Sequence, residues 1–426
     1  MPFELVPQKL VYGGAALGHA QGRTVLVPFA LPGERLEVES LRTAKGVVHA
    51  RPVRVLEAAS QRVLPPCPYF TRCGGCHYQH LAAEYQAAAK VEILRETLRR
   101  LGKIVWDSEI PIHAAHPWNY RNQAQLKVAR MTDGHVGLGF FEAQSHRLFP
   151  VDECLILSPR LNAVLAELRG AEWAHRLAGL REIEMLADDR DEHVMMTLHG
   201  GSDSVGHEAL AREILSRLSG VASVAVHGKR GFRIFGEPAL QYAVGEFRYQ
   251  VSPGSFFQAS RFLLPELVNA ATKGESGALA LDIFAGVGLL TLPLAREFER
   301  VVAVEAHPGS AMDLEANAKA HGCDNVRVAR KAAHDFLRRF AQTEPDLVVL
   351  DPPRAGVGVG TLKLLVGSLP RRIYYVSCSP PTLARDLGYL LARGYTLNSV
   401  ELFEFFPQTY HIECLAKLTR QHNQSY

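Results

Sequence analysis

The sequence lacks any uninterrupted apolar run near the roughly 20 residues that a membrane-spanning helix needs. Its first residues, MPFELVPQKLVYGG, lack the basic segment and the apolar core of a signal peptide. The chain also lacks a large excess of either charge: its net charge is +3 at pH 7, which permits a polyanionic partner without requiring one. These absences predict a cytoplasmic protein.

Cysteine is scarce, and its distribution argues against a disulfide framework. The chain has seven cysteines, an odd number, and three of them cluster in CPYFTRCGGC as Cys67, Cys73 and Cys76. Three thiolates on a loop that contains Gly74 and Gly75 can converge on one metal centre.

A metal centre of this kind needs a fourth ligand, and two candidates stay open. With the neighbouring His77 the set would suit zinc, and with the distant Cys154 it would suit an iron–sulfur cluster. Cys323 and Cys414 have no other cysteine nearby in the sequence, so we expect them to be structural.

The length of 426 residues predicts roughly three domains, at about 150 residues each. Up to about Ser60, short alternating apolar runs broken by Gly and Pro predict a small β-barrel. Its polar residues are basic, which suits either a face that binds single-stranded nucleic acid or a solvated surface. These residues are Arg23, Arg35, Arg42, Lys45, Arg51 and Arg54.

The rest of the chain changes its pattern twice. Residues 81–101 predict a helix, and residues 111–251 predict strands and turns, with hairpins at 135–151 and 182–200. From Phe256 onward apolar strands alternate with helices, which predicts a parallel sheet with crossover helices.

A glycine turn in this last part is suited to a nucleoside cofactor. In ALALDIFAGVGLLTLPLA, Asp282 ends a strand, and Gly286 and Gly288 let the backbone pass close to a ligand. Thr291 stands where a phosphate-binding motif would have its third glycine, so the turn suits S-adenosylmethionine, which has no phosphates. Glu305 follows about 20 positions later, where an acid can bind ribose hydroxyls.

Three further strand ends carry reactive side chains. DLVVLDPPRAGVG ends a strand in Asp351, and IYYVSCSPPTLARDL places Cys378 between a buried strand, 373–377, and a helix. FFPQTYHIECLAKL puts Glu413 on a final strand, where alternation would give it the same face as His411 and Leu415. Taken alone, a free cysteine is more often a small buried hydrophobe.

Together these groups suit the methylation of carbon 5 of uracil, which is a poor nucleophile. A thiolate that adds at carbon 6 activates carbon 5 toward a methyl donor, and a base must then remove the carbon-5 proton so that the thiol is expelled. Because a free thiol is only slightly ionised at pH 7, we expect the helix after Cys378, or Arg354 or Arg385, to lower the thiol pKa.

With these residues the chain resembles the RNA 5-methyluridine methyltransferase family, and most closely its 23S ribosomal RNA branch. The shared stretches span nearly the whole length: GHAQGRTVLVPFALPGE, the cysteine set, SFFQ, LDIFAGVG, DPPRAG, VSCSPPTLARDL and FPQTYHIE. The resemblance implies an α/β, Rossmann-like methyltransferase sheet, an N-terminal TRAM barrel of the OB kind and a central iron–sulfur domain. It implies residues 1–60 for the barrel, 61–80 and 113–255 for the central domain, and 81–112 and 256–426 for the methyltransferase domain.

The resemblance also implies roles for individual residues. Cys378 would be the nucleophile and Glu413 the base, and Cys154 would complete a 4Fe-4S site with Cys67, Cys73 and Cys76. The expected contacts of S-adenosylmethionine are Gln258, Phe284, Gly286, Gly288, Glu305, Asp351 and, as a substitute, Asp335. RNA is the expected partner of a monomeric protein.

Four positions depart from the family pattern. Leu289 and Ala332 replace residues that often contact the cofactor, and Ser260 and Ser379 each replace an Asn. Three other functions stay open: methylation of tRNA, methylation of an amino group by an Asp-Pro-Pro enzyme, and RNA binding by a non-enzymatic iron–sulfur protein. Arg354 stands where an amino-group enzyme would have an aromatic residue.

Overall fold

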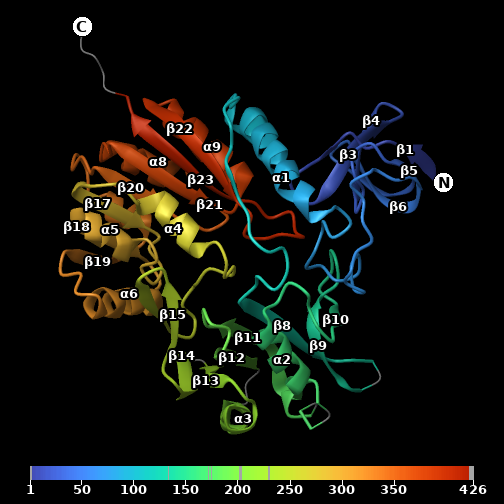
Figure 1. The fold of residues 1–426 in the computed structure, drawn as a ribbon, viewed down its shortest axis with the longest axis horizontal. Coiled ribbons are helices and arrows are strands. Elements are labelled where there is room, and N and C mark those ends of the chain that lie inside the picture. Colours follow the sequence, from blue (N-terminus) through green and yellow to red (C-terminus); the bar gives the residue numbers. More distant parts are fainter. Residues whose placement is uncertain are drawn as a thin grey trace.

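The computed structural model describes residues 2–132, 134–170, 172–173, 175–200, 204–228 and 231–421. The described strands form sheets of six, seven, two and eight strands. Figure 1 shows the six-stranded and the eight-stranded sheets on opposite sides of the molecule, with helix α1 between them and the seven-stranded sheet below. No described helix is both long and apolar enough to cross a membrane.

The N-terminal sheet is a curled half-barrel. Val25, Val27, Leu36 and Val38 alternate with more exposed residues along their strands and fill its concave side. The strand order is β1-β5-β6-β4-β3-β2, so the described edge strands β1 and β2 do not pair with each other, and the small barrel expected from the sequence takes the form of a half-barrel. The strands are β1 (Phe3–Leu5), β2 (Lys9–Leu10), β3 (Ala15–Ala20), β4 (Arg23–Pro28), β5 (Arg35–Ala44) and β6 (Val47–Glu57).

The seven-stranded sheet has one face covered by helices α2 and α3, with an apolar core between the sheet and these helices. Helix α2 begins where Ser158 accepts a hydrogen bond from Leu161 N, with Pro159 in its first turn. Both predicted hairpins are confirmed, because β9 pairs with β10 and β11 with β12, each antiparallel. The elements are β8 (Gln123–Arg130), β9 (Val136–Phe141), β10 (Leu148–Pro150), α2 (Pro159–Leu168), a 3₁₀ turn (Leu177–Gly179), β11 (Leu180–Ala187), β12 (Val194–Gly200), α3 (Ser204–Arg217), β13 (Val221–Gly228) and β14 (Gly231–Gly236).

The eight-stranded sheet has the order β19-β18-β17-β20-β21-β23-β22-β7, and its first five strands are parallel. The chain winds outward from β17 to β19 and then returns to build β20 and β21 on the other side of β17. Such a reversal leaves a crevice at the carboxyl ends of the strands, where ligands of open α/β sheets bind. The predicted alternation of strands and helices is confirmed.

Apart from β7, the elements of this part follow a hairpin of β15 (Leu240–Val244) and β16 (Phe247–Val251). Its strands are β7 (Ile112–His113), β17 (Gly277–Ile283), β18 (Phe298–Glu305), β19 (Val326–Arg330), β20 (Leu347–Leu350), β21 (Arg372–Ser377), β22 (Tyr395–Phe403) and β23 (Glu413–Arg420). Its helices are α4 (Leu264–Thr272), α5 (Thr291–Glu297), α6 (Pro308–Ala320), α7 (Ala333–Leu337), α8 (Val359–Gly367) and α9 (Pro380–Leu391).

Helix α1 (Ala83–Thr97), with the π-helical turn Leu98–Gly102 that follows it, packs on α9 although the two are far apart in sequence. The approach is close: a Cβ added at Gly388 would lie 2.9 Å from the carbonyl oxygen of Gly102. The helix predicted at 81–101 therefore joins the eight-stranded part. The division into three domains with the stated boundaries stays a prediction.

A buried ion pair joins α1 to the loop between β22 and β23. Lys90 Nζ lies 2.5 Å from Glu404 Oε1 and donates to Phe406 O at 2.9 Å, and the two charged side chains are 1% and 6% exposed. Burial lowers the pKa of Lys90 and raises that of Glu404, while each charge opposes the shift of the other. Removal of one partner would leave an uncompensated buried charge.

We therefore expect Lys90→Ala to lower the free energy of unfolding by about 3–5 kcal/mol, the usual cost of breaking a buried pair. The double variant Lys90→Met/Glu404→Leu should recover much of this loss because it leaves no unpaired charge. Denaturant unfolding measures both, with Arg51→Ala, which breaks an exposed pair with Glu39, as the matched control. A loss for Lys90→Ala no larger than that of the control would contradict the prediction.

Candidate active site

The proposed nucleophile and base are brought together by strand pairing. Strand β21 ends at Ser377, and β23, which runs antiparallel to it, begins at Glu413. Ser377 pairs with Cys414, so Cys378 and Glu413 each lie next to one member of this pair, at the carboxyl edge of the parallel strands. The buried strand predicted before Cys378 is confirmed, as all residues of β21 after Arg372 are buried.

Cys378 is half-buried and its pKa is raised to about 12, first by burial and then by the nearby carboxylates of Glu413 and Asp351. Arg354 lowers the pKa of the thiol, as expected, but loss of hydration and the two acids outweigh its charge. Arg385 pairs instead with Asp386 and donates to Ala355 O.

The acids beside the thiol also hold their protons strongly. Burial first, and the Asp351 carboxylate second, raise the pKa of Glu413 well above its ordinary value, against the opposing charge of Arg354. Asp351 has a pKa raised to about 7 by burial and by Asp282, although Gln258 Nε2 donates to its Oδ2 at 3.0 Å. Near neutral pH this edge therefore carries little of the negative charge that its residues suggest.

His411 does not share a strand face with Glu413, contrary to the expectation from alternation. Strand β23 begins only at Glu413, and His411 lies in the preceding loop, where its ring is 4.4 Å from that of Tyr410. Burial and the charge of Arg354 lower the pKa of His411 to about 3, so this imidazole is neutral.

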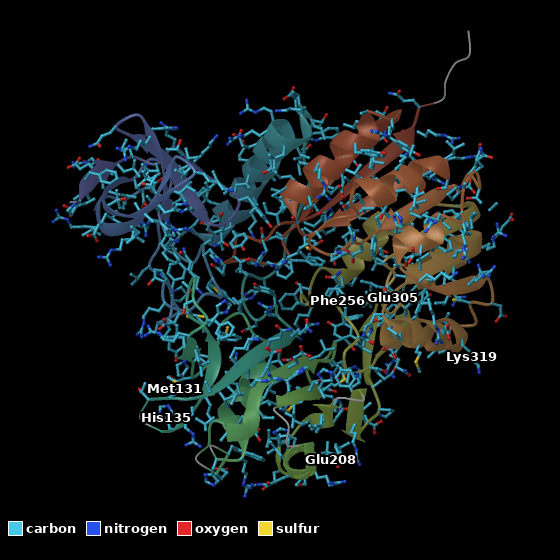
Figure 2. The ribbon with its side chains drawn as sticks, turned by 180° about the vertical axis from the view of Figure 1, so that it is seen from behind. Met131, His135, Glu208, Phe256, Glu305 and Lys319 are labelled. Atoms are coloured by element: carbon cyan, nitrogen blue, oxygen red, sulfur yellow. The ribbon has the colours of Figure 1, made fainter. Side chains whose placement is uncertain are left out.

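The glycine turn after β17 lies next to the acid that ends β18. Gly286 N donates to Glu305 Oε2 at 2.8 Å, and His307 N donates to the other oxygen at 2.6 Å. Phe284, Gly286 and Gly288 all have positive φ angles, of 70°, 55° and 96°, so the turn exposes backbone as a cofactor cradle needs. Figure 2 shows Glu305 and Phe256 on the side of this part that faces the seven-stranded sheet.

Asp282, the acid at the end of β17, has a structural partner. Thr291 Oγ1 donates to Asp282 Oδ2 at 2.5 Å, which ties the first residue of α5 to the strand. Leu289 points into the apolar core, and Asp335 is exposed in α7. Gln258 is thus hydrogen-bonded to Asp351, and Glu305 to the glycine turn. The roles of these residues in binding the cofactor stay predictions.

The four cysteines proposed as ligands line one cavity of about 50 Å³, together with Phe70, Phe140 and other apolar residues. Cys67, Cys73 and Cys76 come from the loop before α1, and Cys154 follows β10, where Cys154 N donates to Asn162 Oδ1 at 2.9 Å. The other candidate, His77, is not among the lining residues, and its ring packs at 4.6 Å from Tyr410.

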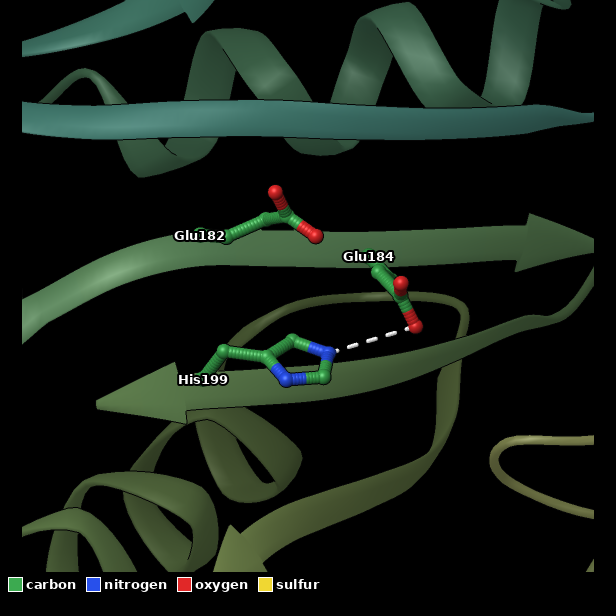
Figure 3. A group of neighbouring side chains, drawn as sticks. All are labelled: Glu182, Glu184 and His199. Atoms are coloured by element: carbon green, nitrogen blue, oxygen red, sulfur yellow. Dashed lines mark ion pairs between the residues drawn. The ribbon is translucent and has the colours of Figure 1, made fainter.

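A second group of possible ligands lies on the seven-stranded sheet, as Figure 3 shows: Glu182, Glu184 and His199. Each has a protein partner, since His199 Nε2 is 3.2 Å from Glu184 Oε2, Gln125 donates to Glu184, and Lys127 pairs with Glu182. Ion pairing across β8, β11 and β12 accounts for this group.

One residue at the catalytic edge was not predicted from the sequence. Tyr12, in the N-terminal half-barrel, lies close enough to Ser379 and Cys378 to interact with both. Tyr12 is more than 360 positions from Cys378 in the sequence, so no local sequence pattern could predict this contact.

Comparison with known proteins agrees with this geometry. An uncharacterized RNA methyltransferase from Aquifex aeolicus is 34% identical over 98% of each chain. One from Thermosynechococcus vestitus is 33% identical over 98% of this chain and 97% of the relative. The crystal structure of the Pyrococcus abyssi tRNA (uracil-54, C5)-methyltransferase in complex with S-adenosyl-L-homocysteine has the same fold, with a TM-score of 0.74 at 23% identity over 98% of this chain and 100% of that one.

The sequence itself matches one enzyme family over residues 83–421, which hold the glycine turn, Asp351, Cys378 and Glu413. The chain belongs to the tRNA (uracil-5-)-methyltransferase family.

Proposed function

We propose that the protein transfers a methyl group from S-adenosylmethionine to carbon 5 of one uridine in 23S ribosomal RNA, through a covalent bond between Cys378 and carbon 6. The observation that carries this proposal is the pairing of β21 with β23, which brings a thiol and a carboxyl group to the ligand edge of the sheet. An enzyme that methylates an amino group would not need the thiol.

Each residue has a defined part in the reaction. The Cys378 thiol loses its proton to solvent and the thiolate sulfur adds to carbon 6. The electron pair of the carbon 5–carbon 6 double bond then becomes available at carbon 5, which takes the methyl group and leaves the donor as S-adenosyl-L-homocysteine. Glu413 then removes the carbon-5 proton, the double bond reforms and the sulfur leaves. A carboxylate with a raised pKa is a stronger base than an ordinary one, which suits Glu413 to this last step.

The residues of the donor site fit S-adenosylmethionine. Glu305 offers carboxylate oxygens for ribose hydroxyls, Gly286 and Gly288 give close backbone approach, and Gln258, Phe284 and Asp351 would surround the rest, with Asp335 as an outer contact. When bound, the donor supplies an electrophilic methyl group on a positively charged sulfur. Asp351, Glu413 and Cys378 would each ionise more readily beside that charge, which offsets their raised pKa values.

Ribosomal RNA is proposed as the substrate because of the resemblance to the 23S ribosomal RNA branch. The half-barrel does not decide between the two RNAs, since the match to the Pyrococcus abyssi tRNA enzyme covers 98% of this chain. The Pyrococcus abyssi neighbour acts on tRNA, so both RNAs belong in the assay. Purified 23S rRNA and tRNA that lack 5-methyluridine are incubated with labelled donor, and the modified base is mapped. Label at a single uridine of 23S rRNA is expected; label only in tRNA would correct the substrate, and label on an amino group would refute the reaction.

We also propose that Cys67, Cys73, Cys76 and Cys154 hold a structural 4Fe-4S cluster. Four thiols around one apolar cavity are a donor set suited to iron–sulfur ligation, and neither Cys378 nor Glu413 lines this cavity. The proposal includes the three domains with the boundaries given above, and a cytoplasmic monomer.

The role of Glu413 can be tested by trapping the enzyme on its RNA. Glu413→Gln should still attack and methylate but fail to remove the carbon-5 proton, so an RNA–protein adduct that survives denaturation accumulates. Cys378→Ala should give no adduct, because the bond to carbon 6 cannot form. Gel mobility after denaturation measures both. Normal turnover by Glu413→Gln without adduct would assign the base to another group.

The basic residues of the half-barrel separate into two sets that can be compared. In the described structure, Arg35, Arg51 and Arg54 pair with acids, whereas Arg23, Arg42 and Lys45 are exposed without an ion pair. Replacing the second set by alanine should weaken RNA binding and reduce the salt slope by about one for each phosphate that is no longer neutralised.

The variant Arg35→Ala/Arg51→Ala is the matched control, since these side chains already have carboxylate partners. Donor affinity should stay unchanged in both variants. Equal salt slopes for the two variants and the wild type would show that this surface does not bind RNA.

The cluster predicts a brown protein after anaerobic purification, with a broad absorption from thiolate-to-iron charge transfer. Cys154→Ser should lose most of this absorption, while His77→Ala should keep it, because His77 lies outside the cavity. Metal analysis distinguishes the alternatives. Colourless wild-type protein with one zinc per chain would overturn the cluster.

A further inference from the structure

A loop of the N-terminal half-barrel reaches the catalytic edge. The turn between β2 and β3 holds Tyr12, Gly13 and Gly14, closed by Val11 N donating to Ala15 O at 2.9 Å. Gly14 has a φ of 88°, and a Cβ at this position would lie 3.1 Å from the Cβ of His77. The loop therefore presses closely on the residue after Cys76, and only glycine fits there without strain.

The ring of Tyr12 belongs to an aromatic group built from distant parts of the chain. It meets Tyr410 edge to face, with ring centroids 5.5 Å apart and planes at 86°. Tyr410 in turn contacts His77 at 4.6 Å and His411 at 4.4 Å, and it lies three residues before Glu413. This group joins the half-barrel, the loop that carries the cysteines, and the loop that leads to the proposed base.

The side chain of Tyr12 lies near the proposed nucleophile. Its ring packs on Tyr410, and it is close enough to Ser379, Cys378 and Arg354 for these residues to affect the pKa of its hydroxyl. Burial, the main cause, raises the pKa of Tyr12, so the phenol keeps its proton at neutral pH and can act as a donor. Tyr12 is only half-buried, which leaves part of the side chain free to meet a ligand.

From this placement we propose that Tyr12 forms one wall of the pocket for the target uracil and donates a hydrogen bond to a carbonyl oxygen of the base. The inference rests on the proposed function and adds a substrate contact supplied by the half-barrel. Attack of sulfur at carbon 6 moves negative charge onto the carbonyl oxygen at carbon 4, and a donor already in place stabilises that charge. Uracil offers no other strong hydrogen-bond acceptors than its two carbonyl oxygens.

This placement makes the half-barrel part of the active site. Because Tyr12 comes from the turn between β2 and β3, the pocket is complete only while the half-barrel is docked on His77 and Tyr410. Loss of the phenol should therefore slow attack on the base without changing the donor site, whose residues lie on other elements.

The test uses an RNA oligonucleotide that carries 5-fluorouridine at the mapped position. After methyl transfer its carbon 5 bears fluorine in place of a removable proton, so the covalent adduct persists and its rate of formation reports attack by Cys378. Tyr12→Phe keeps the ring and removes the donor, and it should slow adduct formation about tenfold. Tyr12→Ala also removes the wall and should slow it about 100-fold.

The matched controls are Tyr85→Phe and Tyr85→Ala, which alter an exposed tyrosine of α1. These variants should form adduct at the wild-type rate. Titration with S-adenosyl-L-homocysteine should give equal affinity for all variants, and equal unfolding midpoints for Tyr12→Phe and the wild type would show that the fold is intact.

Two results would contradict the inference in distinguishable ways. Adduct formation by both Tyr12 variants within twofold of the wild type would refute the contact while leaving the proposed function intact. Absence of adduct with the wild-type protein, on RNA that it binds, would refute the covalent mechanism and the Tyr12 contact with it.

Discussion

The structure depends on a small buried polar network that holds the loop between β22 and β23. The Gln86 side chain donates to Gln408 Oε1 at 2.9 Å and accepts from Gln408 N at 2.7 Å, and one turn further along α1 Lys90 pairs with Glu404. Both α1 side chains are 1% exposed. A buried polar group without a partner costs about 1–3 kcal/mol, so these bonds favour a single arrangement of the loop strongly.

The same loop is where three distant parts of the chain meet. The amides of His77 and Tyr78, just after the cysteine loop, donate to Gln408 O at 2.8 and 2.9 Å. The loop then presents Tyr410 to the half-barrel and ends at Glu413, the first residue of β23. The cysteine loop, the proposed base and the half-barrel contact are thus positioned by one segment, which agrees with the structural role proposed for the cluster.

Burial governs the chemistry of the site more than the residue types alone suggest. Asp351, Cys378 and Glu413 are three acids at one edge with a single nearby cation, Arg354, and burial is the largest cause of each raised pKa. The raised pKa values lower the negative charge of the site before a cationic donor and an RNA base arrive. The half-barrel was expected to bind phosphates, yet four of its seven Lys and Arg residues are paired with acids, which reduces its free positive charge: Lys9, Arg35, Arg51 and Arg54.

The sequence alone determined the features that depend on local pattern. Alternating runs predicted both hairpins of the seven-stranded sheet, and a continuous apolar run predicted β21 before Cys378. The order of strand, glycine turn and acid predicted the contact of Gly286 with Glu305, since neighbouring parallel strands end at one edge. The family motifs are local in the same sense.

Only the tertiary structure decided what depends on neighbours from elsewhere in the chain. Alternation placed His411 on a strand with Glu413, but the bonds of Gln408 to Gln86 and of its carbonyl oxygen to His77 and Tyr78 hold a loop there instead. The raised pKa of Cys378 follows from its burial, and the position of Tyr12 beside it follows from contacts between distant segments. A sequence pattern carries residue type and spacing, whereas hydration and through-space charge depend on the packed chain.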